Sequence, residues 1–278
     1  MIRFRPADGC LDLAETLDCG QAFRWKPVLL PNGREAWRGI AFGHCLTLWK
    51  DGEEFVFDCT EEEFRTIWYG YFDFDTDYAA LREALSALHP VLKEACSYAP
   101  GIRILRQEPW EALCSFIISQ NNNIPSIKGI IERLCSLSGQ PILCGEETVY
   151  SFPAAKQLAV CTAEDLAPLR AGFRAKYLLD AARRVSTGQL DLHALYTASL
   201  EDARSALMTV HGVGHAHIDT GWLWPVKETV RKCARTYAAQ LDLIERYPEY
   251  IFGASAPQHY AFIKKTLSGT FQKNQRSR

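Results

Sequence analysis

Residues 205–224 read SALMTVHGVGHAHIDTGWLW, and this one stretch combines two patterns that belong to different chemistries. In its first half a helical segment runs into Gly212 and Gly214, which permit positive φ and close backbone approach, as in the hairpin between two DNA-binding helices. In its second half His217 and Asp219 alternate with Ile218, so on a β-strand both side chains would point the same way and could share a metal ion. An ordinary helix-ending turn and two polar surface residues are the alternatives.

The composition is that of a globular protein. The chain has 278 residues, of which 47% are apolar and 23% are charged, so it is long enough for about two domains and apolar enough to bury a core. It contains no apolar run of the roughly 18 residues that a membrane span requires. The N-terminal segment MIRFRPADGCLDLAE lacks the apolar region of an export signal. We therefore expect a cytoplasmic protein with no membrane partner, and we expect it to be a monomer.

The cysteines argue against two classes of protein, and the net charge leaves a third class open. Ten cysteines are scattered singly, with no C-x-x-C pair, so disulfide scaffolds and zinc fingers are poor interpretations and we expect reduced core thiols. The net charge of −2 does not show the basic footprint that is usual for a nucleic-acid-binding protein. A local patch or a helix terminus can still provide such a surface.

The patterns upstream of residue 205 predict an α+β fold. Residues 1–60 alternate in the manner of antiparallel strands, with hairpin turns at Asn32-Gly33 and Asp51-Gly52. Thr60 and Glu63 fit a capping box at the start of helical segments. After a linker near residue 100, helices are expected to begin at Pro109, to end at Gly139, to break near Gly172 and to begin again after Ser199. We therefore expect an antiparallel sheet domain with flanking helices at 1–100 and an all-helical domain at 101–214.

Three further stretches give the hairpin a context. They are GQAFRW at 20–25, LRQEPWEALCSFIISQNNN at 105–123 and GFRAKY at 172–177, in that order. Together with the hairpin they resemble the 8-oxoguanine DNA glycosylase family of the helix-hairpin-helix superfamily, over about residues 1–214. The resemblance implies base-excision repair by a DNA glycosylase with AP lyase activity, acting on double-stranded DNA that contains oxidised guanine. It implies no cofactor for this part of the chain.

The resemblance also implies roles for individual residues. Because the base must leave the stack, Asn121 is expected to fill the gap and to contact the orphaned base. Phe173 and Arg174 match the positions that read the opposite cytosine, and the carbonyl of Gly20 matches the acceptor that detects the added N7 hydrogen. Gly212, Val213 and Gly214 would bind a DNA phosphate. Pro125-Ser126 stand where some relatives place a second cytosine-reading arginine, so discrimination of the opposite base is expected to be loose.

After the hairpin this resemblance stops. The family's nucleophilic lysine, which attacks C1′ to form a Schiff base, is replaced by Ala216. The family's catalytic aspartate segment and pocket-closing C-terminal helix have no counterpart, and Gly221 and Pro225 interrupt any second helix of the hairpin. We therefore expect impaired catalysis.

A second resemblance covers about residues 212–268. This segment is similar to the start of the catalytic domain of zinc-dependent class II α-mannosidases, which implies a strand-helix-strand fragment within 215–278 and a weak zinc site at His217 and Asp219. The chain is thus interpreted as a join, and a gene fusion, an assembly or prediction error and a truncated pseudogene are all open as its origin. Two alternative functions stay open, a metal-binding glycoside hydrolase fragment and a non-catalytic DNA-binding protein.

Overall fold

The computed structural model describes residues 1–120, 122–145, 147–211 and 213. The chain divides into two compact units, Met1–His211 and Gly212–Arg278, and the description below concerns the first. The strand-helix-strand fragment expected within 215–278 lies outside the described residues, and the expected domain boundaries at 100 and 214 stay predictions. In the described part of the chain, no helix is long and apolar enough to cross a membrane.

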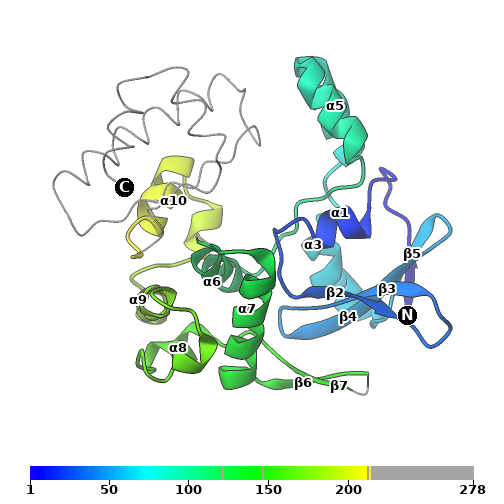
Figure 1. Ribbon diagram of the computed structural model, residues 1–278. Helices are drawn as coiled ribbons and strands as arrows, with labels where there is room; N and C mark the ends of the chain where they lie inside the picture. Colours follow the sequence, from blue (N-terminus) through cyan, green and yellow to red (C-terminus); the bar gives the residue numbers. More distant parts are fainter. Residues whose placement is uncertain (121, 146, 212, 214–278) are drawn as a thin grey trace. The chain divides into compact units, whose positions relative to one another are not determined.

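A five-stranded antiparallel sheet forms the N-terminal part, as the alternating sequence predicts (Figure 1). Its spatial order is β1-β5-β4-β3-β2, and each neighbouring pair is antiparallel. Gly33 and Gly52 adopt φ values of +78° and +67° in the two predicted hairpin turns. The strands are β1 (Ile2–Phe4), β2 (Trp25–Leu29), β3 (Glu35–Ala41), β4 (His44–Asp51) and β5 (Glu54–Phe57).

Trp25 organises the core beneath this sheet. It pairs with Gly39 across β2 and β3, and a Cβ atom built on Gly39 would lie only 2.2 Å from the Trp25 ring. A side chain at position 39 would therefore displace the indole. The indole N–H donates to the Tyr71 hydroxyl at 2.8 Å, which satisfies the polar edge of a ring that is 1% exposed.

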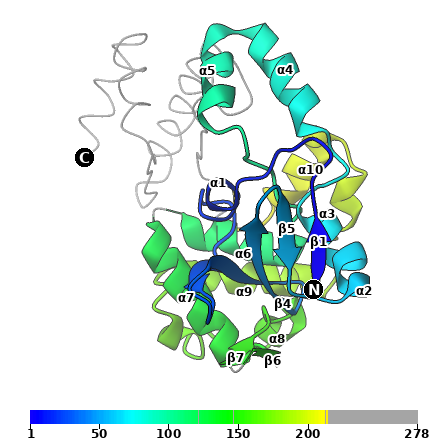
Figure 2. The same ribbon diagram turned by 90° about the vertical axis from the view of Figure 1, so that its right-hand side faces the viewer.

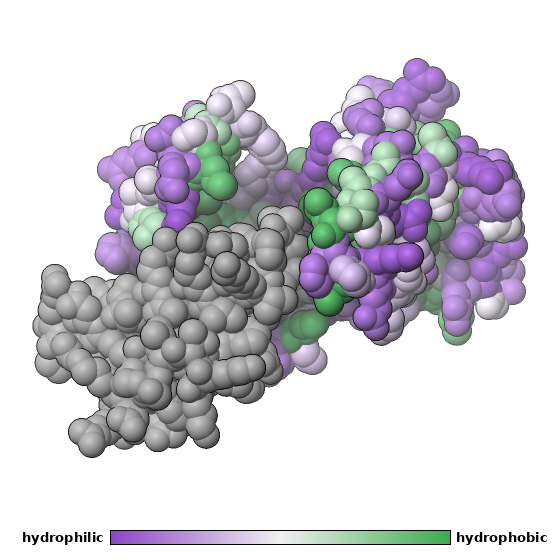
Figure 3. Space-filling model, turned by 90° about the horizontal axis from the view of Figure 1, so that it is seen from above, coloured by the Kyte–Doolittle hydropathy of each residue, from purple (hydrophilic) through white to green (hydrophobic). Residues whose placement is uncertain are grey.

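Short helical segments cover one face of the sheet. They are α1 (Leu13–Leu17), α2 (Glu61–Glu63), a π-helical turn at Phe64–Trp68 and α3 (Tyr69–Tyr71). The predicted capping box at Thr60 and Glu63 is confirmed, whereas α1 was not predicted. Two longer helices, α4 (Tyr78–Leu88) and α5 (Pro90–Tyr98), extend away from the sheet in both ribbon views (Figures 1 and 2). Seen from above, hydrophilic residues cover most of the described surface, with hydrophobic patches that include exposed residues of α5 (Figure 3).

The segment expected as a linker is anchored by a buried arginine. Arg103 is 1% exposed and forms an ion pair with Asp8 at 2.9 Å. Its guanidinium also donates to the carbonyl oxygens of Phe72, Cys10 and Asp73 at 2.9, 2.6 and 2.8 Å. A sequence pattern does not reveal this role, because the partners come from two distant segments, residues 8–10 and 72–73.

The second half of the unit is mainly helical and begins at Pro109, as predicted. Gly139 ends α7 and Ser199 caps α10, both as predicted. A two-stranded hairpin within this region was not predicted, so the region is not all-helical. The elements are α6 (Pro109–Ser119), α7 (Ile124–Ser138), β6 (Pro141–Cys144), β7 (Glu147–Tyr150), α8 (Ala155–Ala159), a 3-10 turn (Ala167–Leu169), α9 (Arg174–Ser186), a second 3-10 turn (Ala194–Tyr196) and α10 (Leu200–Leu207).

The cysteines differ from the prediction at two positions. Cys45 of β4 and Cys144 of β6 form a disulfide with a sequence separation of 99, so the expectation of ten reduced thiols is wrong for this pair. Seven other cysteines within the described residues are free. The pairing could not be predicted, because neither cysteine lies in a local motif and only the tertiary fold brings β4 and β6 together.

Candidate functional site

The turn after α1 holds Gly20 in a backbone conformation that side chains rarely adopt. Its φ is +89°, a region that glycine reaches without a steric penalty. The side chain of the next residue, Gln21, fixes the turn: its amide nitrogen donates to the carbonyl oxygens of Thr16 and Arg103, both at 2.8 Å, and its amide oxygen accepts from the Leu105 N–H at 3.0 Å. The main chain at Gly20 is therefore positioned by the core and not by a flexible loop.

Gly20 lies beside the N-terminal end of α7. A Cβ atom built on Gly20 would lie 3.8 Å from Cδ1 of Ile124, which is ordinary van der Waals contact. One turn further along α7, the Lys128 ammonium group donates to Asp18 at 2.7 Å. The Asn123 side chain caps the helix by accepting from the Ser126 N–H at 3.0 Å. The start of α7 and the Gly20 turn thus form one surface.

Arg174 reaches the same region from the other side. Its Nε donates to the Gln120 carbonyl oxygen at 2.8 Å, and Nη1 donates to the Ala171 carbonyl oxygen at 3.3 Å. The residue is 9% exposed, and this burial lowers the pKa of the guanidinium from its ordinary value. The guanidinium carbon lies 4.7 Å from the centre of the half-exposed Phe173 ring. Arg174 is therefore a fixed and partly desolvated cation, not a mobile surface charge.

The loop before α9 is itself tied to α7. Arg133 of α7 donates from Nε and Nη2 to the Leu169 carbonyl oxygen at 3.0 and 2.8 Å. Arg170 and Gly172 then adopt left-handed φ values of +55° and +59°, which confirms the predicted break near Gly172. These contacts determine where Phe173 and Arg174 are presented.

The structure brings together the described residues that the sequence singled out from distant segments. A Cβ atom built on Gly20 would touch Ile124, the first residue of α7, and Arg174 donates to Gln120, the residue after α6, so both lie at the junction of α6 and α7. Val213 is half-buried in a turn. The positions outside the described residues are Asn121, Gly212, Gly214, Ala216, His217 and Asp219. Gln21, Gln120 and Arg133 were missed because their role is to hold main chain, for which a sequence carries no signal.

His211, which precedes Gly212 in the chain, contacts Asp180 of α9. The His211 main-chain N–H donates to Asp180 Oδ2 of α9 at 2.9 Å, and the imidazole Nδ1 lies 3.0 Å from the same oxygen. Burial alone would raise the pKa of Asp180, but the hydrogen bonds from His211 and Arg184 outweigh it and lower that pKa. The carboxylate thus connects the end of the α10 segment to α9.

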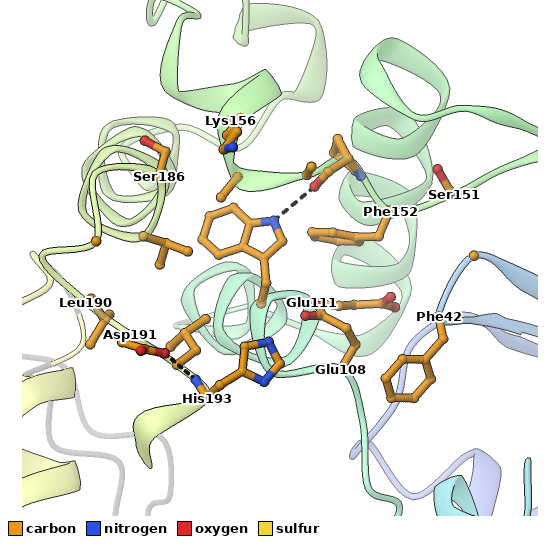
Figure 4. Close-up of a pocket in the computed structure, with 18 residues that line it drawn as sticks. Phe42, Glu108, Glu111, Ser151, Phe152, Lys156, Ser186, Leu190, Asp191 and His193 are labelled. Atoms are coloured by element: carbon orange, nitrogen blue, oxygen red, sulfur yellow. Dashed lines mark hydrogen bonds between the residues drawn. The ribbon is translucent and has the colours of Figure 1, made fainter. Parts of the chain in front are cut away.

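A cavity lies apart from the surface at Gly20, Arg174 and the start of α7. It has a volume of about 740 Å³, and Gly20 and Arg174 do not line it. Figure 4 shows Phe42 at one side and His193 and Asp191 at the other, with Glu111 of α6 and its N-cap residue Glu108 between them. Burial raises the pKa of Glu111 to about 7, against the opposing effect of the Arg24 guanidinium. Arg24 is 8% exposed, and its Nε and Nη1 have no hydrogen-bond partner among the described residues.

Two family profiles match different parts of the chain. Residues 2–113 match the N-terminal domain of 8-oxoguanine DNA glycosylase. Residues 207–276 match the N-terminal domain of glycosyl hydrolases family 38. The second match begins within α10 and runs through the residues that the structure does not describe.

Similar proteins follow the same division. The N-glycosylase/DNA lyase of Saccharomyces cerevisiae is 33% identical over 227 residues, which cover 73% of this chain and 60% of that protein. Human alpha-mannosidase 2C1 is 51% identical over 67 residues, which cover 24% of this chain and only 6% of that protein. A solved structure of MBOgg1 in complex with a low-affinity DNA ligand is 33% identical with a TM-score of 0.70, over 99% of this chain and 93% of that chain. The chain thus spans less than two thirds of either curated relative.

Proposed function

Because the chain belongs to the 8-oxoguanine DNA glycosylase family through its N-terminal part, we propose that it recognises oxidised guanine in double-stranded DNA. The observation that carries this proposal is that Gly20 and Arg174 both lie at the junction of α6 and α7. Arg174 is held by its own hydrogen bonds to main-chain oxygens, and the turn at Gly20 is held by those of the neighbouring Gln21 side chain. A preorganised surface of this kind suits recognition, because little order has to be gained on binding.

Gly20 and Arg174 have distinct roles in the proposal. Oxidation of guanine adds a hydrogen at N7, and a fixed carbonyl at Gly20 is an acceptor for it. Arg174, with Phe173 against its guanidinium, provides hydrogen-bond donors that suit cytosine or a phosphate. The N-terminus of α7 supplies the positive end of a helix dipole, which favours a DNA phosphate.

Base excision itself is not part of the proposed function. By the family resemblance, the lysine amine that attacks C1′ would stand at position 216, where this chain has alanine. Without a nucleophile there, no imine can form at that position. We therefore propose a lesion-binding protein with impaired glycosylase and lyase activity, acting as a cytoplasmic monomer.

Binding to labelled duplexes tests the proposal directly. The whole chain is titrated against a duplex with 8-oxoguanine opposite cytosine and against the same duplex with guanine, at low and at high salt. We expect weak, salt-sensitive binding with a preference for the lesion, since phosphate contacts release counterions. Equal and negligible binding to both duplexes at both salt concentrations would contradict it.

The match of residues 207–276 to glycosyl hydrolases family 38 supports a second, narrower proposal. His217 and Asp219, which lie outside the described residues, are proposed to bind zinc weakly, because two protein ligands leave much of a tetrahedral shell to water. We propose no mannosidase turnover by the 278-residue chain. Stoichiometric zinc after dialysis against a chelator, or hydrolysis of an α-mannoside, would contradict these statements.

A further inference from the structure

The disulfide between Cys45 and Cys144 joins the sheet to the β6–β7 hairpin. Cys45 lies on β4, Cys144 ends β6, and their Cα atoms are 5.7 Å apart. This separation lies within the range in which two cysteines can pair without movement of the backbone. The folded chain can therefore bring the two sulfur atoms together in either oxidation state.

The ion pairs between the hairpin and the sheet depend on one exposed carboxylate. Glu147 of β7 lies 3.5 Å from both Lys26 and Arg38, and the Lys26 and Glu147 side chains are more than half exposed. Ion pairs of this exposure contribute little to stability. The Arg24 guanidinium also donates to the Tyr150 carbonyl oxygen. A covalent bond between Cys45 and Cys144 would thus be the strongest single link between these two elements.

Several other thiols are protected by their surroundings. Burial raises the pKa of Cys59 to about 11 and of Cys135 to about 12, and it also raises the pKa of Cys10 and Cys114. Because the thiolate is the nucleophile, these groups react slowly near neutral pH. Cys45 is half-buried and has a second cysteine directly beside it, which is the arrangement of an oxidisable pair.

We propose that Cys45 and Cys144 are a reversible thiol–disulfide pair, oxidised by a hydroperoxide, that cross-links the sheet to the β6–β7 hairpin. The Cys45 thiolate attacks one peroxide oxygen, the O–O bond breaks, and a sulfenic acid forms as the other oxygen leaves as water. The Cys144 thiolate then attacks the sulfenic sulfur, so the S–S bond forms, the S–O bond breaks and a second water leaves. Two thiols thus give two electrons and two protons to one hydrogen peroxide, and a dithiol reductant reverses the change.

The cross-link closes a large loop. The two cysteines are 99 residues apart, and the loop between them contains α2 to α7. Closing a loop of this length restricts the unfolded chain strongly. We therefore expect oxidation to raise the thermal stability of the unit. The pairing involves no DNA, so it is independent of the proposed function.

Peptide mapping and thermal unfolding of the whole chain test the proposal. The protein is reduced with dithiothreitol, desalted, divided, and one half is treated with one equivalent of hydrogen peroxide. We expect a linked Cys45–Cys144 peptide only in the oxidised half, together with a rise in Tm of about 5–10 °C that dithiothreitol reverses. No linked peptide after oxidation, or a linked peptide without a change in Tm, would overturn the proposal.

Variants separate this pair from the other thiols. In Cys45→Ser, a change at a half-buried position, the oxidation-dependent rise in Tm should be lost while the reduced Tm stays close to that of the reduced wild type. Cys144→Ser tests the partner. Cys19→Ser, at an exposed free cysteine, is the matched control, and Cys233→Ser, at a position outside the described residues, is a second control. Both variants should keep the full rise. A rise that persists in Cys45→Ser but disappears in either control would assign the effect to another thiol and contradict the proposal.

Discussion

The Arg174 guanidinium donates from Nε to the main-chain oxygen of Gln120 at 2.8 Å, across 54 residues of sequence. This contact joins the first residue of α9 to the residue that follows α6. Arg174 is thus both the proposed reader of the base opposite the lesion and a structural tie. Any contact with a base has to coexist with this bond or replace it, so a substitution at Arg174 is expected to affect both roles.

Arg174→Ala is expected to weaken both roles. The Gln120 oxygen loses a charge-assisted hydrogen bond, so the free energy of unfolding should fall by about 1–3 kcal/mol. Discrimination between cytosine and adenine opposite 8-oxoguanine should also fall, as measured by duplex binding. Arg174→Lys keeps the charge but loses the planar guanidinium. Compared with Arg174→Ala, it should therefore recover affinity for the duplex more than it recovers discrimination of the opposite base.

Arg183→Ala is the control for that measurement. Arg183 lies near the other end of the same helix, and its hydrogen bonds to Ala159 and Cys161 are long, both at 3.4 Å. Its removal should change stability by less than about 1 kcal/mol and leave opposite-base preference unchanged. Unchanged preference in Arg174→Ala as well would remove the proposed role of Arg174.

Gly20→Ala is expected to reduce lesion preference through the backbone and not through a clash. The added Cβ would only touch Ile124, but a φ of +89° is unfavourable for alanine by about 1–2 kcal/mol. Relaxation of the turn would move the Gly20 carbonyl. Gly33→Ala is the matched control, because Gly33 has a φ of +78° and open space around it. Both variants should lose similar stability in denaturant unfolding, and only Gly20→Ala should lose preference for 8-oxoguanine over guanine.

Arg103→Leu is expected to be severely destabilising. It leaves the Asp8 carboxylate, whose side chain is 5% exposed, without its ion-pair partner, and it removes donors from several buried carbonyl oxygens. Breaking a buried ion pair on one side costs about 3–5 kcal/mol. Arg5→Leu, in a pair with Glu53 whose two side chains are 61% and 74% exposed, should cost less than about 1 kcal/mol. Equal Tm values for the two variants would contradict the role given to Arg103.

Glu111 should make stability depend on pH. Its pKa is about 7 in the folded chain, above its value when unfolded, so the folded state binds more protons between these two pKa values. The free energy of unfolding therefore falls by about 3 kcal/mol in total as pH rises through this interval. Above the folded-state pKa it no longer changes with the titration of Glu111. Denaturant unfolding between pH 5 and 8 should show this loss in the wild type and not in Glu111→Gln. Exposed Glu132→Gln should retain the wild-type slope, and a slope that survives in Glu111→Gln would place its origin elsewhere.

The sequence predicted the parts of the fold that depend on local chemistry. The turns at Gly33 and Gly52, the capping box at Thr60 and Glu63 and the helix ends at Pro109 and Gly139 are confirmed, because each follows from a backbone preference of the residue itself. The π-helical turn at Phe64–Trp68 and the hairpin β6–β7 were missed. Both lie in segments whose final form is decided by packing against other elements.

The candidate site divides in the same way. Gly20 and Arg174 could be singled out by resemblance, but their convergence on Gln120 and Ile124 depends on the packing of α6, α7 and α9. The Gln21 side chain holds the turn at Gly20 by hydrogen bonds to main-chain carbonyl oxygens. Because every residue has such a carbonyl, no sequence pattern identifies this role of Gln21. The Cys45–Cys144 pair likewise depends on contact between β4 and β6.

The absence of an amine at position 216 leads to a prediction about covalent chemistry. A lysine that attacks C1′ forms an imine, which borohydride reduces to a stable protein–DNA adduct. Because this step requires the amine to be held against the sugar, a distant lysine such as Lys227 is a poor substitute for the missing one. We expect neither a trapped adduct nor strand nicking with duplex DNA that contains 8-oxoguanine, with the yeast N-glycosylase/DNA lyase assayed in parallel as the positive control.

Ala216→Lys alone should not restore excision, because the family's aspartate segment has no counterpart in this sequence. An adduct in the wild type that disappears in Lys227→Ala would show that another lysine performs the chemistry, and excision by Ala216→Lys would show that the site lacks only its nucleophile.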